Sequence, residues 1–286
     1  MSEALKNKVD FALIIAVNNA NPNGDPLNGN RPRQTYDGFG EISDVCLKRK
    51  LRNRLQDMGE RIFVQSDDRR DDEHRSLNAR YAAEKLKDPR VEGCAKWYDV
   101  RAFGQLFAFK KKKTKKEEED GGDADAASIG IRGPVSIQSA FSVEPVIPET
   151  IQIVKSVNLE TNEKEPDKKG SDTMGMKHRV GRAVYVAYGA INTQLAKETG
   201  FSAQDAEKLK KAMRSLFVND ESTARPAGSM EVLKIIWWQH NHPNGQYSSA
   251  QVHRSLKVAK DGSYELTTLK GLKAEELSEL YGTELD

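Results

Sequence analysis

The chain of 286 residues contains only two cysteines, Cys46 and Cys94, and they form no CxxC pair. A disulfide framework is therefore not indicated. No run approaches the roughly 18 consecutive apolar residues of a membrane-spanning helix. The opening residues, MSEALKNK, also lack the apolar core of a signal peptide. These shortages predict a protein of the reducing cytoplasm that has no membrane partner.

Net charge is scarce as well. Charged residues make up 31% of the chain, yet the formal net charge at pH 7 is only +2. A near-neutral total does not by itself favour nucleic-acid binding, whereas a basic stripe on one helix does so weakly. Five cations fall between residues 48 and 54 and predict such a stripe. The length fits one core with large insertions as well as it fits two domains.

A nucleotide-hydrolysing loop is not expected either. The stretch NPNGDPLNGNRPR follows the first apolar run, and Gly24 and Gly29 have the spacing of a P-loop. A P-loop continues with Lys and then Ser or Thr, whereas this chain has Asn30 and Arg31. Pro26 also removes a backbone N–H from the turn that would hold a phosphate. The stretch therefore needs another role.

Apolar periodicity predicts the order of the elements. Residues 9–17 alternate as a strand does, and residues 43–58 form a helical stripe that Ser43 caps and Gly59 ends. A capping box of Ser202 and Asp205 starts a second helix through Phe217. The other expected elements are strands over 135–143, 151–157, 183–188 and 230–240, a hairpin over 252–268 and a helix over 273–281. We expect strand 151–157 to pair with strand 135–143 across the turn EPVIPE.

This order approximates the ferredoxin-like βαββαβ plan of an α+β domain, which RNA-recognition motifs share. Three charged or polar segments interrupt it, at residues 64–96, 110–128 and 156–180. The middle one has six lysines followed by acids and small residues, and is too poor in apolar residues to offset its ordering entropy, so we predict disorder there. The sequence thus predicts a single domain over residues 1–286 with three inserts.

The basic helix has two interpretations. Its leucines face the core, and its cations lie on both flanks and on the outer side, at Lys48, Arg49, Lys50, Arg52 and Arg54. They form either an ordinary solvated helix face or a rail for phosphates. Few acids on the same helix offset these charges, which favours the rail.

The aromatic signature of RNA-recognition motifs is missing. That signature expects a basic residue, Gly, an aromatic, Gly and another aromatic on a central strand. The nearest stretch, from Arg132 to Val135, reads RGPV and has no aromatic residue. Base stacking on the sheet is therefore not indicated, and an RNA would be held by its backbone.

Other candidate groups favour ordinary structural roles. His240 and His242 lie two apart on a strand, but without a third ligand they predict a strand end that enters a turn, so we expect no metal and no cofactor. Asp25 and Asp37 lie in a loop where an acid could help to cleave RNA, although aspartates are also common turn formers.

The third insert changes character near its end. Met174 and Met176 alternate, so both would lie on one side of an extended segment, and Lys177, His178 and Arg179 follow them. Either this is a loop tip with its methionines in the core, or it is a hairpin that reaches over an RNA groove. In the second case the apolar tip would displace a base, which costs a few kcal/mol.

Taken together, these motifs resemble a known family. The segments NPNGDPLNGNRPR, ISDVCLKRKLRN, YDVRAFGQLF, IRGPVSIQSAFSVEPVI and RAVYVAYGAI occur in the order found in the repeated backbone subunit of the type I-C CRISPR Cascade complex. The resemblance runs from about residue 9 almost to the C-terminus. It implies a hand-like subunit, with a modified RNA-recognition palm, an inserted finger at 64–96 and a thumb hairpin at 156–180.

The resemblance also implies partners and a function in antiviral defence. Several copies would line up head to tail along one CRISPR RNA, which pairs with target DNA, beside the subunit that processes and holds the guide 5′ end, the large subunit and the small subunits. The subunit itself would be non-catalytic. Besides the basic helix and the residues from Met174 to Arg179, the expected RNA contacts are Asn21, Asn23, Asn28, Asn30, Arg31, Arg33 and Gln138.

Two alternatives remain open on the sequence alone. Relatives in type III complexes cut target RNA with a loop aspartate, so the chain could be a metal-dependent endoribonuclease. It could also be a solitary RNA-binding regulator, which would remain a monomer on short RNA.

Overall fold

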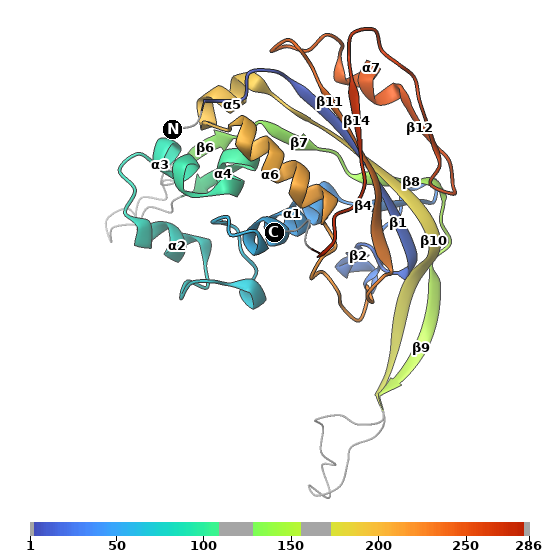
Figure 1. Ribbon diagram of the computed structural model, residues 1–286. Coiled ribbons are helices and arrows are strands. Elements are labelled where there is room, and N and C mark those ends of the chain that lie inside the picture. The colour runs from blue at the N-terminus through green and yellow to red at the C-terminus, as the bar shows by residue number, and fades with distance from the viewer. Residues whose placement is uncertain (1–2, 109–127, 156–172, 283–286) are drawn as a thin grey trace, which may run out of the picture.

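The computed structural model describes residues 3–108, 128–155 and 173–282, and its centre is an eight-stranded antiparallel sheet (Figure 1). The main path of the sheet runs β14-β11-β1-β10-β8-β4, and β7 and β9 also pair with β10. The strands are β1 (Val9–Ala20), β4 (Phe39–Ile42), β7 (Val135–Ile137), β8 (Ala140–Pro145), β9 (Glu149–Lys155), β10 (Thr173–Ile191), β11 (Met230–Gln239) and β14 (Ala274–Leu277).

Helices cover one face of the sheet. Phe11, Leu13 and Ile15 of β1 belong to a large core cluster with α1 (Asp44–Asp57) and α6 (Ala203–Arg214), and the short helix α5 (Thr193–Thr199) precedes α6. The predicted helix starts are confirmed, because Ser43 Oγ accepts from the Cys46 backbone N–H at 3.2 Å and the capping box of Ser202 and Asp205 is present. The second helix ends at Arg214, three residues before the predicted end.

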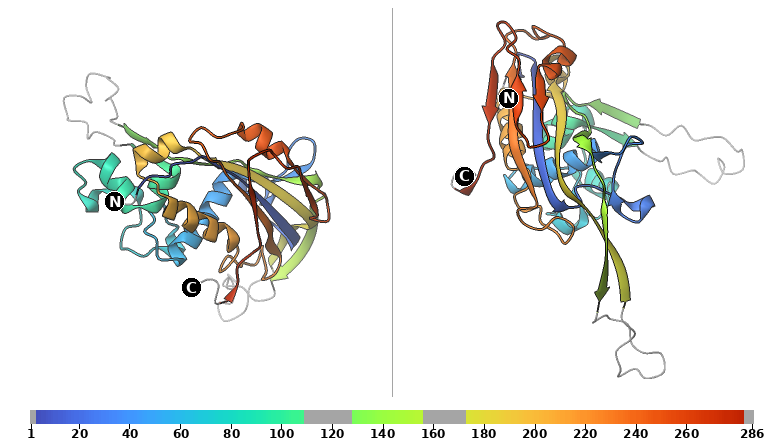
Figure 2. Two further views of the ribbon diagram at one scale, coloured as in Figure 1. Left: turned by 45° about the horizontal axis from the view of Figure 1, so that its top comes forward. Right: turned by 90° about the vertical axis from the view of Figure 1, so that its right-hand side faces the viewer.

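The opposite face of the sheet is covered as well. Ala12 and Ile14 of β1 belong to a second cluster, in which they join Trp238 and residues of the C-terminal part of the chain. That part contains α7 (Ser249–Arg254) and a small hairpin of β12 (Leu256–Val258) and β13 (Tyr264–Leu266), which lies over the sheet in Figure 2. The sheet therefore has no wide open face on which a nucleic acid strand could lie flat.

The α+β class is confirmed. Along the chain, β1, α1, β8, β10, α6 and β11 follow one another as strand, helix, strand, strand, helix and strand, with other elements between them. In the sheet these four strands stand in the order β11-β1-β10-β8, and each neighbouring pair is antiparallel.

A smaller cluster organises the region after α1. Phe63, Trp97 and Phe107 pack together, with 4.6 Å between the ring centroids of Phe63 and Trp97. Its elements are α2 (Leu77–Glu84), α3 (Pro89–Lys96), α4 (Tyr98–Phe103), β5 (Gly104–Ala108) and β6 (Ser128–Arg132). The core of this region thus draws on residues on both sides of the segment 64–96.

Three sequence predictions about elements are wrong. The strand over 135–143 is interrupted between β7 and β8, where the Gln138 backbone N–H donates to the Tyr188 carbonyl at 2.8 Å. Residues 151–155 pair with the start of β10 and not with β8. The C-terminal helix over 273–281 is instead β14, because antiparallel pairing with β11 outweighs a helix-favouring composition.

Two predictions concern residues outside the described ranges. The predicted disorder at 110–128 falls on undescribed residues except for Ser128, which begins β6, and most of the insert at 156–180 is also undescribed. Among the residues that the structure describes, no helix is both long and apolar enough to cross a membrane.

A buried charge network joins the start of β1 to the end of β11. Asp10 is fully buried, and its carboxylate lies 2.8 Å from His240 Nε2 and 3.0 Å from Lys8 Nζ. Burial alone would raise the pKa of Asp10, but hydrogen bonds from His240, Ser249 and Lys8 outweigh it, so the pKa lies below its ordinary value. His253 Nε2 of α7 is 3.7 Å from the same carboxylate and 3.2 Å from the Gly189 carbonyl oxygen.

The first prediction concerns the pH dependence of stability at His253. Burial lowers its pKa more than the Asp10 carboxylate raises it, whereas the unfolded chain keeps a value near 6.5. The unfolded state then binds more protons around that pH, so the free energy of unfolding falls as pH drops through about 6.5. A His253→Gln variant does not titrate there. Its thermal midpoint should fall less than that of the wild type from about pH 7.5 to 5.5, and equal falls would contradict the assignment.

Candidate nucleic-acid interface

The Asn-rich loop is an ordered hairpin, not an open phosphate loop. Two-residue strands β2 (Gly24–Asp25) and β3 (Arg31–Pro32) pair on either side of the short 3-10 helix η1 (Pro26–Asn28). Asn21 is buried and its Nδ2 donates to the Asn30 carbonyl at 2.7 Å. Asn23 Oδ1 accepts from the Ser43 backbone N–H at 2.9 Å and from Ser43 Oγ at 2.8 Å. These two asparagines hold the loop against α1 and do not face outward.

The rest of the predicted loop contacts are accessible. Asn28, Asn30 and Arg31 are exposed at the tip, and Leu27 beside them is 98% exposed. Asn30 has a positive φ of 59°, a conformation that asparagine tolerates better than most residues. Arg33 is partly exposed and its Nη2 lies 3.5 Å from Asp25 Oδ1.

The cations of α1 do not form the predicted rail. Lys50 is only 4% exposed and forms an ion pair with Asp220, and Arg54 is 6% exposed and donates from Nε to Ser215 Oγ at 2.7 Å. The prediction that these two flank an open surface is therefore wrong. Their partners lie more than 150 residues away in the sequence, so the lack of acids on the helix itself was no guide.

The other three cations of α1 also have protein partners. Arg52 Nε lies 2.9 Å from the buried carboxylate of Asp99. Arg49 donates to the Val64 carbonyl at 2.9 Å, and Lys48 pairs with Asp44 one turn earlier at 3.1 Å. All three remain partly exposed, so they keep some access to solvent.

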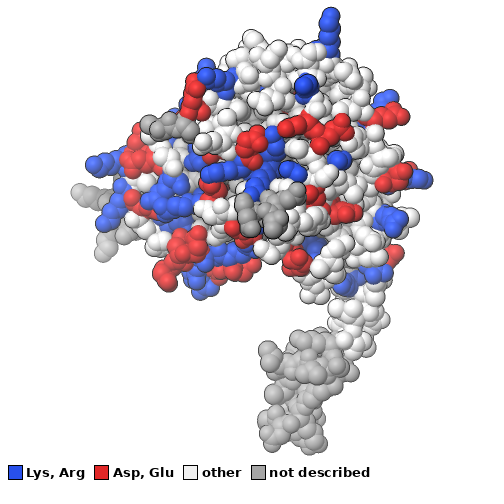
Figure 3. All heavy atoms as spheres, in the orientation of Figure 1, with Lys and Arg blue, Asp and Glu red and all other residues white. Residues whose placement is uncertain are grey.

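A long hairpin projects from the body, with β9 on one side and the first part of β10 on the other (Figures 1 and 2). Met174 and Met176 are 69% and 61% exposed on it, which contradicts the interpretation that places them in the core. Met174 lies opposite Val154, which is also exposed. The described part of the hairpin is largely uncharged in Figure 3.

The basic residues at the base of the hairpin have neighbours on β9. Arg179 Nε donates to Glu149 Oε2 at 2.8 Å, and His178 Nδ1 lies 2.9 Å from Thr150 Oγ1. Lys177 is partly exposed on the same stretch.

The structure brings the loop, the start of α1 and the base of the hairpin to one end of the molecule. The Asp44 backbone N–H donates to Ser139 Oγ at 3.3 Å, next to the exposed Gln138. Gln34 Nε2, just after the loop, donates to the Val146 carbonyl at 2.6 Å, shortly before β9 begins. The accessible predicted residues of this end are Asn28, Asn30, Arg31, Arg33, Gln138, Met174, Met176, Lys177, His178 and Arg179.

The two strand-end histidines have structural roles, as the sequence favoured. His240 Nδ1 accepts from the Gln246 backbone N–H at 2.8 Å, and His242 Nδ1 accepts from the Asn244 backbone N–H at 3.1 Å. Across the part of the chain that the structure describes, no three His, Cys, Asp or Glu side chains gather closely enough to hold a metal ion.

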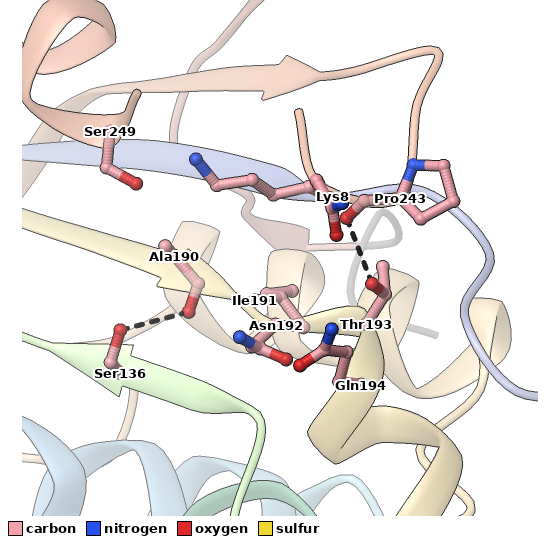
Figure 4. Close-up of a pocket in the computed structure, with 10 residues that line it drawn as sticks. Lys8, Ser136, Ala190, Ile191, Asn192, Thr193, Gln194, Pro243 and Ser249 are labelled. Carbon is pink, nitrogen blue, oxygen red and sulfur yellow. Dashed lines mark hydrogen bonds between the residues drawn. The ribbon is translucent and has the colours of Figure 1, made fainter. Parts of the chain in front are cut away.

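A pocket of about 340 Å³ lies at the other end of β10 (Figure 4). Lys8, Ser136 and Asn192 line it, and Thr193 Oγ1 donates to the Pro243 carbonyl at 2.9 Å. None of the predicted RNA contacts lies there, because Ile191 at the end of β10 lines this pocket whereas Met174 and Met176 lie near its start.

Comparison with known proteins identifies a family. The family model of CRISPR-associated protein Cas7 matches residues 7–276. A curated relative, CRISPR-associated protein Cas7 of Haloferax volcanii, is 26% identical over 275 residues, which are 92% of this chain and 79% of the relative.

Two solved structures are similar in part. A chain of a CRISPR RNA-guided surveillance complex is 17% identical with a TM-score of 0.46, over 90% of this chain and 77% of that chain. A chain of such a complex in a pre-nicking state is 14% identical with a TM-score of 0.43, over 81% and 78%. At these scores the two likenesses say nothing further about this chain.

The second prediction tests the structural role of the buried cation on α1. Lys50→Ala removes one partner of a buried ion pair and should lower the free energy of unfolding by about 3 kcal/mol. The matched control, Lys48→Ala, removes a more exposed pair on the same helix and should cost no more than about 0.5 kcal/mol. Urea denaturation measures both, and similar losses in the two variants would contradict the assignment.

Proposed function

The chain belongs to the Cas7 family of CRISPR-associated proteins, and on that premise we propose that it is the repeated, guide-RNA-binding backbone subunit of a type I-C Cascade complex. In this role several copies bind head to tail along one CRISPR RNA and present it for pairing with target DNA. The other Cascade subunits are its further partners, and the cytoplasm is its location.

The observation that carries this proposal is the projecting β9–β10 hairpin. It holds exposed Met174, Met176 and Val154 away from the body, where they bury no surface within the chain. Solvated apolar side chains on a protruding element favour contact with another molecule. The loop tip with Asn28, Asn30 and Arg31 lies at the same end and supplies amide donors and one positive charge for a sugar–phosphate backbone.

In this proposal the strands β11, β1, β10 and β8 with α1 and α6 form a modified RNA-recognition-motif palm. The hairpin is the thumb, and residues 64–96 belong to the finger. Since C-terminal residues cover the sheet face opposite α1 and α6, the RNA is held by the loop and the hairpin, not across the open sheet of an ordinary RNA-recognition motif.

We assign the subunit no catalytic role. Asp25, an acid considered for RNA cleavage, accepts from the Leu27 backbone N–H at 3.2 Å and lies 3.5 Å from Arg33. These contacts make it a turn former, which explains its position without a cleavage reaction.

The third prediction is that RNA binding and self-association are coupled. A subunit that holds a few nucleotides gains little affinity alone, but neighbours on one strand raise the effective concentration for each other. Multi-angle light scattering of the full chain with RNA of increasing length should show particles whose mass grows in steps with that length. Single subunits on every RNA would instead favour a solitary regulator.

The fourth prediction concerns the two exposed methionines. If their side chains displace a base, guide bases are presented in short segments, and mismatches at the displaced positions are tolerated. Complexes that carry both Met174→Ala and Met176→Ala should lose this tolerance, measured as binding of target DNA with single mismatches along the guide.

The matched control is Val91→Ala, which truncates an apolar residue of 61% exposure on α3, away from the hairpin. This control should keep the periodic tolerance. If the methionine variant also keeps it, the methionines do not act on the bases.

A further inference from the structure

A shared carboxylate lies beneath the Asn-rich loop. Asp220 pairs with buried Lys50 of α1 and also lies 3.2 Å from Arg225 Nε. Both Asp220 and Arg225 come from the segment of residues 219–229 between α6 and β11, which the sequence did not mark as a site.

This segment lies directly against the start of the Asn-rich loop. The Asn18 backbone N–H donates to the Ser229 carbonyl at 2.8 Å, and the Asn21 backbone N–H donates to the Ala224 carbonyl at 2.9 Å. The cations of the two segments also act on one thiol. Burial raises the pKa of Cys46, while the positive charges of Lys50, Arg225 and Arg33 oppose the rise.

Positive charge exceeds negative charge at this junction. Arg31, Arg33, Lys50 and Arg225 bring four cations, whereas only two carboxylates, Asp25 and Asp220, pair with them. Exposed Glu221 adds a third carboxylate and still leaves one cation in excess. Partly buried cations without enough counter-charge raise the free energy of the fold, and a bound anion offsets that cost.

Hydrogen-bond donors are unused at the same place. Arg33 Nε is shielded from solvent but donates to no atom of the described residues, and the Nη2 contact of Arg33 with Asp25 is long for a hydrogen bond. Arg225 donates only from Nε and its backbone N–H, which leaves both terminal amino groups without a partner in the described ranges. Guanidinium groups with free donors suit the oxygens of a phosphate.

We propose that Arg33 and Arg225 form a phosphate-binding site that holds one phosphodiester group of a bound single strand between the Asn-rich loop and the segment 219–229. This inference rests on the proposed function and adds to it a contact that lies outside the loop, the helix α1 and the hairpin. Asp220 is a positioning residue here, because it orients Arg225 from one side and leaves its terminal amino groups free on the other.

The fifth prediction uses the full chain with a labelled single-stranded RNA of mixed sequence. Arg225→Gln should weaken binding roughly tenfold at low salt. The slope of log affinity against log salt should fall by about 0.7, the value for one phosphate contact on a single strand. Arg225→Lys should keep the slope, since it keeps the charge. The matched control is Arg254→Gln on exposed α7, which lies on the other side of the sheet and should leave the slope unchanged.

Thermal unfolding of each variant tests whether it folds, and Arg33→Gln provides a second test on a separate segment. Unchanged slopes in both Arg225→Gln and Arg33→Gln would overturn the site. A wild-type chain that does not bind RNA would instead contradict the proposed function. Inorganic phosphate at constant ionic strength tests the other source of the same chemistry. If it stabilises the wild type but not Arg225→Gln while their RNA slopes agree, the site binds a small anion and the proposal is wrong.

Discussion

The pairing of β1 with β10 is the interaction on which the rest of the structure depends. β10 has 19 residues, and at about 3.3 Å per residue it spans roughly 60 Å. Its second part pairs with β1 from Val180 to Ile191, while its first part pairs with β9 in the projecting hairpin. Since β1 is buried in a different cluster on each face, a shift of one residue would exchange the two sets of core side chains. The register in the core therefore also sets the position of Met174 and Met176.

The cations of α1 show how a charge pattern acquires its meaning from the fold. On the sequence they suggest a surface for phosphates, but Asp220, Ser215 and Asp99 receive three of them inside the molecule or at its margin. These partners tie α1 to α4 and to the segment after α6. The helix thus stabilises the loop beside it, and the free positive charge moves to Arg31, Arg33 and Arg225.

Local patterns predicted the elements that depend on local interactions. The strand β1, the helix α1 with its Ser43 cap and the capping box of α6 follow from periodicity and from side chains three residues apart. The break between β7 and β8, the pairing of β9 with β10 and the strand β14 depend on contacts between distant residues, which no short window contains. The same holds at the site, where exposure of Met174 or burial of Lys50 is decided by segments far away in the chain.

The two outermost strands of the large sheet are both poor templates for a further strand. β14 has four residues, two of which are Glu275 and Glu276, and Glu275 is held by Lys210 at 2.8 Å. β4 also has four residues, and the chain before it crosses its far side, where the Glu41 backbone N–H donates to the Arg33 carbonyl at 2.9 Å. Short, charged or covered edges resist edge-to-edge strand addition and the aggregation that follows from it. Copies of this chain therefore cannot extend one continuous sheet, and the length of any assembly must be set by something other than backbone pairing between subunits.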